Sequence, residues 1–64
     1  MKLWITRNKL GELNLFKGEK PKFYAKTGWW LSEDYYFETI LPRELFPEIT
    51  FENSPQEVEL KLIK

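Results

Sequence analysis

The chain has 64 residues, with ten basic and ten acidic side chains and with neither histidine nor cysteine. This length allows one small domain, spanning residues 1–64, and without disulfides or a histidine–thiolate zinc site its stability must come from apolar burial. The missing histidine and cysteine also remove the commonest general base and the thiol nucleophile. We therefore expect no enzyme, no cofactor and no metal site.

Charge is unevenly distributed along the chain. Residues 1–30 hold seven basic and two acidic side chains, whereas residues 31–64 hold three basic and eight acidic ones. Such asymmetry can mark a polarised binding surface. It also arises when basic N-terminal strands pair beside acidic C-terminal strands, because opposite charges stabilise cross-strand pairs. We favour this second interpretation.

The first seventeen residues predict a β-hairpin. Residues 2–7 and 12–17 both alternate between apolar and other side chains, which is the period of a strand. Residues 8–11 (NKLG) lie between them and form a turn, since Asn tolerates and Gly favours the left-handed backbone. One face of this hairpin would carry Leu3, Ile5, Leu13 and Leu15, and the other Trp4 and Phe16.

The central region predicts a second hairpin. Residues 18–21 (GEKP) interrupt the sheet, and residues 22–26 (KFYAK) fit either a short edge strand or an irregular crossing. Residues 29–31 and 35–40 are rich in aromatic and β-branched side chains, as strands are. The polar residues 32–34 between them would form the turn, with aromatic pairs across the two strands.

Two prolines frame a different local structure in residues 41–47 (LPRELFP). Pro42 suits the first position of a helical turn, and Pro47 ends it because the residue before proline avoids the α region. We expect one helical turn near residues 42–46 that plugs an end of the sheet, followed by a short strand over residues 48–52.

The C-terminal segment supports two interpretations. Residues 54–57 (SPQE) match a helix capping box with proline at the first helical position. Residues 57–64 nevertheless alternate with the strand period, and a helix would scatter their aliphatic side chains. We favour a strand, and we expect the two terminal strands of the chain to pair.

These elements predict an all-β domain with one short helical turn. The sheet would be small and antiparallel, with a barrel or roll as its curled form. The expected core contains one of Trp29 and Trp30 together with Leu3, Ile5, Leu13, Leu15, Phe37, Leu45, Phe46, Phe51, Val58, Leu60 and Leu62.

Four fragments of the sequence carry a resemblance. They are MKLWI at the start, GWW at 28–30, LPRELFP at 41–47 and TFENSPQEVELKL at 50–62. In these fragments the chain resembles a group of short uncharacterised bacterial or phage proteins. The resemblance covers most of the chain and implies no activity, because that group has no established function.

Protein binding, including self-association into a homodimer, is the functional hypothesis that we favour. Neighbouring residues in a strand point to opposite faces, so the predicted sheet carries apolar side chains on both. Exposed aromatic residues often mark interfaces, and the candidate surface consists of Trp4, Phe16, Trp30 and Tyr36. In the alternative interpretation, the chain itself covers this second face.

Single-stranded nucleic acid is the other candidate partner. Rings interleaved with cations bind single strands by stacking and charge attraction. The sequence offers Lys17, Lys20, Lys22 and Lys26 with Phe23, Tyr24, Trp29 and Trp30. Only one arginine lies in this half of the chain, and the core needs most of these rings, so we rank this hypothesis second.

The expected location is the cytoplasm. The N-terminal residues lack the apolar region of a signal peptide, and no apolar run is long enough to cross a bilayer. A sequence without cysteine also fits a reducing compartment. We therefore expect no contact with a membrane.

Overall fold

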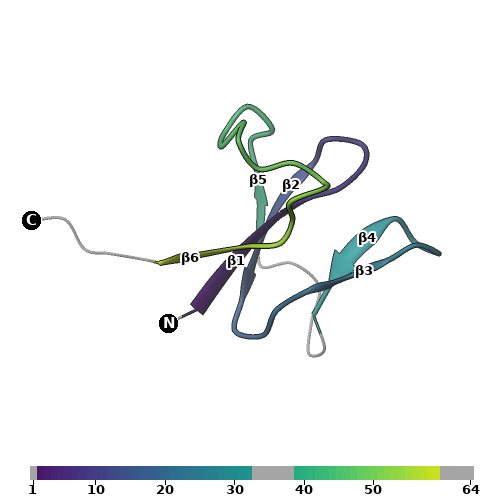
Figure 1. Cartoon of the computed structure of the whole chain (residues 1–64), viewed down its shortest axis with the longest axis horizontal. Coiled ribbons are helices and arrows are strands. Elements are labelled where there is room, and N and C mark those ends of the chain that lie inside the picture. Colours follow the sequence, from purple (N-terminus) through teal and green to yellow (C-terminus); the bar gives the residue numbers. More distant parts are fainter. Residues whose placement is uncertain (1, 33–38, 60–64) are drawn as a thin grey trace, which may run out of the picture.

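Six short strands form two antiparallel sheets in the computed structural model, which describes residues 2–32 and 39–59 (Figure 1). The strands are β1 (Lys2–Arg7), β2 (Leu13–Lys17), β3 (Lys22–Tyr24), β4 (Trp29–Leu31), β5 (Thr39–Leu41) and β6 (Gln56–Glu59). The larger sheet has the order β5-β2-β1-β6, and β3 pairs with β4 in the smaller one. The predicted all-β class is confirmed. The sheet is not closed into a barrel.

The N-terminal hairpin is confirmed, and Asn8 organises its turn. The Asn8 carbonyl accepts the Gly11 N–H at 3.0 Å, and the Asn8 side-chain oxygen accepts the N–H groups of Leu10 and Glu12 at 2.9 and 3.0 Å. Gly11 has φ 88°, which costs glycine no steric clash. The turn residues and the alternation of apolar side chains therefore both predict the β1–β2 hairpin that the structure shows.

One face of the larger sheet carries the aliphatic core. Ile5 and Leu13 are buried there together with Ile49, which comes from the segment between β5 and β6. That segment therefore covers the face. The partly buried side chains packed against this centre are Leu15, Leu41 and Val58.

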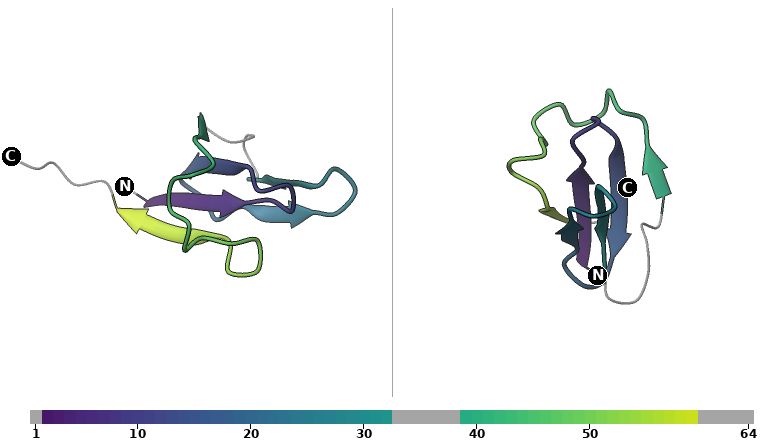
Figure 2. Two further views of the ribbon diagram at one scale, coloured as in Figure 1. Left: turned by 90° about the horizontal axis from the view of Figure 1, so that it is seen from above. Right: turned by 90° about the vertical axis from the view of Figure 1, so that its right-hand side faces the viewer.

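The opposite face of the larger sheet is buried as well. Thr6, Asn14 and Phe16 are at most 1% exposed. The β3–β4 hairpin lies in front of β1 and β2 when the molecule is viewed from its right-hand side (Figure 2). Both faces of this small sheet are thus used for folding.

A cluster of three rings joins the smaller sheet to the rest of the chain. Trp30 is buried, and its indole N–H donates to the Arg7 carbonyl at 3.1 Å. Phe23 and Phe51 complete the cluster, with ring centroids 4.9 Å apart and 5.4 and 6.1 Å from Trp30. The Lys9 ammonium lies 5.3 Å from the Phe51 centroid and 5.8 Å from that of Phe23. The cluster connects β1, β3, β4 and the turn that follows Ile49.

The second hairpin predicted from the sequence would pair residues 29–31 with residues 35–40, of which residues 35–38 lie outside the described part of the chain. Where the structure describes the two arms, they pair with other strands. Residues 29–31 pair with β3, because a turn over residues 25–28 reverses the chain, with Thr27 and Gly28 donating to the Tyr24 carbonyl. β5 instead pairs with β2 and extends the first hairpin. Residues 22–26, for which two interpretations were open, contain the strand β3.

The helical turn expected near residues 42–46 is also corrected. Leu45 N–H bonds to the Pro42 carbonyl at 3.1 Å, which closes one turn. Phe46 then adopts φ 49°, so the chain leaves the right-handed helical region. A second turn follows, in which Ile49 N–H donates to the Phe46 carbonyl at 2.9 Å. No described residue is helical.

The strand expected over residues 48–52 is replaced by turns. Asn53 is the cause, because its side chain accepts the Thr50 N–H and donates to the Glu48 carbonyl, both at 2.8 Å. Such side-chain bonds give the backbone an alternative to a sheet ladder.

The terminal strands pair as predicted, with β6 antiparallel to β1 and Lys2 opposite Glu59. Residues 56–59 are a strand, which favours the strand interpretation as far as the described residues extend. Lys2 opposite Glu59 is one instance of the basic-beside-acidic pairing expected from the charge distribution.

The predicted core is correct for some residues and wrong for others. Leu45 and Phe46 are exposed, because the two turns hold them on the outside. Ile49 and Phe16 are buried instead, and of the two neighbouring tryptophans Trp30 is the buried one. The predicted residues Leu3, Leu15, Phe51 and Val58 are half-buried, and Phe37, Leu60 and Leu62 lie outside the described residues.

Candidate interaction surfaces

The four aromatic residues predicted as an interaction surface do not form an exposed patch. Phe16 and Trp30 are buried, so the prediction is wrong for these two. Trp4 is half-buried, and its indole N–H donates to the Gly18 carbonyl at 3.0 Å. Tyr36 lies outside the described residues. The second sheet face is therefore used mainly for folding.

Other apolar side chains are exposed instead. Leu45 and Phe46 are 43% and 42% exposed on the two turns that follow β5. No periodic pattern indicates this exposure, since it follows from the left-handed backbone at Phe46. Among the described residues, the other large apolar side chains at the surface are Leu10, Tyr24 and Ile40.

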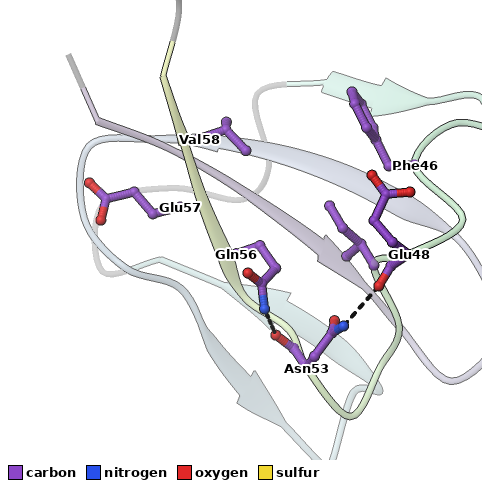
Figure 3. Close-up of a pocket in the computed structure, with 7 residues that line it drawn as sticks. Phe46, Glu48, Asn53, Gln56, Glu57 and Val58 are labelled. Carbon is purple, nitrogen blue, oxygen red and sulfur yellow. Dashed lines mark hydrogen bonds between the residues drawn. The ribbon is translucent and has the colours of Figure 1, made fainter.

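A groove of about 430 Å³ lies between β6 and the turns that precede it. Figure 3 shows Gln56 and Val58 of β6 on one side and Phe46 and Glu48 on the other, with the Glu57 side chain extending away from them. Three consecutive residues of β6 contribute to the lining, so the groove follows the strand. The lining residues are Phe46, Glu48, Ile49, Asn53, Gln56, Glu57 and Val58.

Hydrogen bonds hold the wall of this groove in place. Besides its bond to Glu48, Asn53 accepts the side-chain N–H of Gln56 through its carbonyl. The Arg7 guanidinium donates to the carbonyls of Phe46 and Ile49 at 3.2 and 2.6 Å. The apolar wall is therefore preorganised, which lowers the entropic cost of binding.

The main chain of β6 presents hydrogen-bonding groups at the sheet edge. Arg7 N–H donates to Ser54 Oγ at 2.8 Å, so the Arg7 amide points toward the β6 side of β1. Backbone groups alternate in direction along an antiparallel strand, and Ile5 and Leu3 therefore bond to Gln56 and Val58. The N–H and C=O of Glu57, between these two residues, then point away from β1. Among the described strands, β1 is the only neighbour of β6.

The basic and aromatic residues of the nucleic-acid hypothesis do not share one surface. All four lysines are exposed, but Lys17 pairs with Leu3 in the larger sheet. In the smaller sheet, Phe23 is opposite Trp30 and both contact Phe51. Tyr24 and Trp29 are opposite each other on the other face, with Lys22 on the same side. Only Tyr24 and Trp29 thus share a face with Lys22, and the cation beside Phe23 is Lys9, which is not one of the four predicted lysines.

Comparisons with known proteins give no relative: no protein family, no curated protein and no solved structure matches the chain. The resemblance to short bacterial or phage proteins stays an expectation. Within residues 2–32 and 39–59, no three acidic side chains gather closely enough to hold a metal ion. The same residues contain no helix with the length and apolarity needed to cross a membrane.

Proposed function

We propose that the chain is a small, non-catalytic protein-interaction module whose partner binds along β6. The observation that carries this proposal is the position of the groove beside a strand at the sheet edge. Phe46, Ile49 and Val58 supply apolar surface there, and the outward main-chain groups of Glu57 lie beside it. Unpaired edge groups next to an apolar groove are the features by which many domains bind extended peptides.

The composition of the groove supports a protein partner. Phe46 is an aromatic side chain that is 42% exposed in the unbound chain, so a partner can bury much of its remaining apolar area. Leu45, which is next to it, is exposed to the same degree. Large aromatic side chains at the centre of a patch supply a major part of the binding energy of interfaces. We propose the cytoplasm as the location, in line with the absence of cysteine.

Panning of a random peptide library against the immobilised chain tests this function. The Phe46→Asn variant serves for counter-selection, because asparagine removes the ring and tolerates the positive φ at this position. The matched control is Leu10→Asn, which removes an exposed leucine from the β1–β2 turn. We expect enriched peptides that bind the natural chain and Leu10→Asn but not Phe46→Asn. Enrichment of no peptide, or equal binding to Phe46→Asn, would contradict the proposal.

One observation favours single-stranded nucleic acid as a second candidate partner. Tyr24 and Trp29 are directly opposite on one face of the β3–β4 hairpin, and exposed Lys22 lies on that face as well. This arrangement combines rings for stacking with a cation for phosphate. Titration of a fluorescent single strand at low and moderate salt tests it, with Lys22→Gln as the variant. Binding that ignores salt, or no binding, removes this candidate.

A further inference from the structure

We infer that the partner is an extended segment that joins the sheet as a strand beside β6 and alternates apolar with basic residues. This inference rests on the proposed function and adds the chemistry of the partner. Three features of β6 support it: the direction of the main-chain groups of the strand, the difference between its two faces, and the negative charge of its glutamates.

The main chain of β6 determines how a partner would pair. The backbone N–H and C=O groups of Gln56 and Val58 bond to β1. A partner that bonded to these groups would have to break the existing ladder. Glu57 directs its groups outward. An added strand would therefore form its hydrogen bonds at Glu57, and the rest of the sheet would not need to change.

The two faces of β6 select different side chains in the added strand. On one face, Val58 lies beside the groove formed by Phe46 and Ile49. Glu57 also contributes to the lining of the groove, but its side chain extends to the other side of the strand from Gln56 and Val58 (Figure 3). Successive residues of an added strand point to these faces in turn, so apolar residues would meet the groove and the residues between them would meet Glu57.

The charge beside β6 favours basic residues in the partner. Glu57 is exposed, and Glu48 lines the groove. Opposite charges across strands are stabilising, and like charges are destabilising. A lysine or arginine opposite Glu57 would satisfy this preference. A second copy that paired through the same four residues would bring carboxylates together, so the partner is a different segment.

Synthetic peptides test the inference. The probe is an eight-residue peptide that alternates lysine and valine, with a fluorophore at one end, and binding is measured by anisotropy. Three control peptides accompany it: one alternates glutamate and valine, one groups the lysines before the valines, and one carries N-methyl groups on alternate residues. We expect the alternating lysine–valine peptide to bind at least ten-fold more tightly than each control, and its affinity to decrease with salt.

Two variants of the chain separate the main-chain contribution from the charge. Glu57→Pro removes the outward N–H and keeps the ladder with β1, because proline is tolerated where an edge N–H faces solvent. Glu57→Gln keeps the N–H and removes the charge. We expect Glu57→Pro to abolish binding of the lysine–valine peptide, and Glu57→Gln to weaken it three- to ten-fold. Circular dichroism verifies that both variants keep the fold, and if Glu57→Pro does not, the N-methylated peptide alone decides the main-chain contribution.

The outcomes distinguish this inference from the proposed function. Equal binding of the lysine–valine and glutamate–valine peptides, or unchanged binding after N-methylation, overturns the inference. Library peptides that require Phe46 would still support the proposed function in that case. Sedimentation of the chain alone tests whether a second copy of the chain pairs along β6. A dimer that dissociates in the Glu57→Pro variant would overturn the inference in favour of self-pairing.

Discussion

The side chain of Arg7 donates a hydrogen bond from Nε to the carbonyl of Ile49 at 2.6 Å, joining positions 42 residues apart in the sequence. The two remaining nitrogens of the guanidinium donate to further carbonyls, at distances between 2.7 and 3.2 Å. These belong to Gly11, Arg43, Leu45 and Phe46. One planar cation in β1 therefore fixes both turns that follow β5. It also positions Ile49 in the core and the wall of the groove beside β6.

Arg7→Lys should destabilise the fold. Lysine keeps the charge, but it has one nitrogen and cannot reproduce the fork of a guanidinium. Hydrogen bonds to charged groups contribute about 1.5–3 kcal/mol each, and three of the five Arg7 bonds are exposed and so contribute less. Because lysine can keep some of the five, we expect the free energy of unfolding to fall by about 2–3 kcal/mol. Urea titration followed by circular dichroism measures this change.

Arg43→Lys is the matched control for that experiment. The Arg43 side chain is exposed and makes one hydrogen bond, at 3.3 Å, to the Leu10 carbonyl. We expect this variant to change stability by less than about 0.5 kcal/mol. Equal effects of the two substitutions would show that the carbonyl contacts of Arg7 do not hold the turns.

Lys9→Gln should weaken the ring cluster. The Lys9 ammonium lies within 6 Å of the centroids of both Phe23 and Phe51, where a cation is attracted to aromatic faces. Glutamine removes the charge and keeps a similar length, so we expect a loss of about 0.5–1 kcal/mol. Lys20→Gln, at an exposed position before β3, should have no measurable effect. Thermal unfolding of both variants tests the difference, and a loss as large in Lys20→Gln would argue for a general charge effect.

Gly11→Ala and Gly11→Asn should differ in stability. Gly11 has φ 88°, and a Cβ at this position would meet no atom within 4 Å, so the cost of substitution is confined to the backbone. Alanine should lower the free energy of unfolding by about 1 kcal/mol, and asparagine by less, because asparagine tolerates the left-handed region. Thermal denaturation measures both. Equal losses would mean that backbone conformation is not what selects glycine here.

The sequence predicts the β1–β2 hairpin because its information is local. Alternation identifies both strands, and Asn8 and Gly11 identify the turn between them. The pairing of β4 is not local in this sense. Aromatic composition indicates strands at residues 29–31 and 35–40, but it does not indicate which strand pairs with which. The turn at residues 25–28 decides the pairing, and its signal is weaker than that of the polar residues that follow.

The candidate site could not be predicted for a different reason. Ile49 is buried and Phe46 is exposed on turns whose carbonyls accept hydrogen bonds from Arg7 in β1, and no pattern within residues 46–49 shows this. The charge asymmetry of the sequence did indicate acidic residues near the C-terminal strand. Which of them line a groove depends on the turns around Asn53, which replace the strand expected there.

Thr6 and Thr50 should respond in opposite directions to substitution by valine. Thr6 is fully buried, and its hydroxyl has no hydrogen-bond partner in the described part of the chain. A buried hydroxyl without a partner costs about 1–3 kcal/mol, and valine has nearly the same shape and suits a strand. Thr6→Val should therefore raise the free energy of unfolding by about 1 kcal/mol. The Thr50 hydroxyl accepts the Asn53 N–H at 3.2 Å, so Thr50→Val should lower it by about 1 kcal/mol. Urea titration of both variants measures the two changes, and a loss of stability in Thr6→Val would contradict this account of the second sheet face.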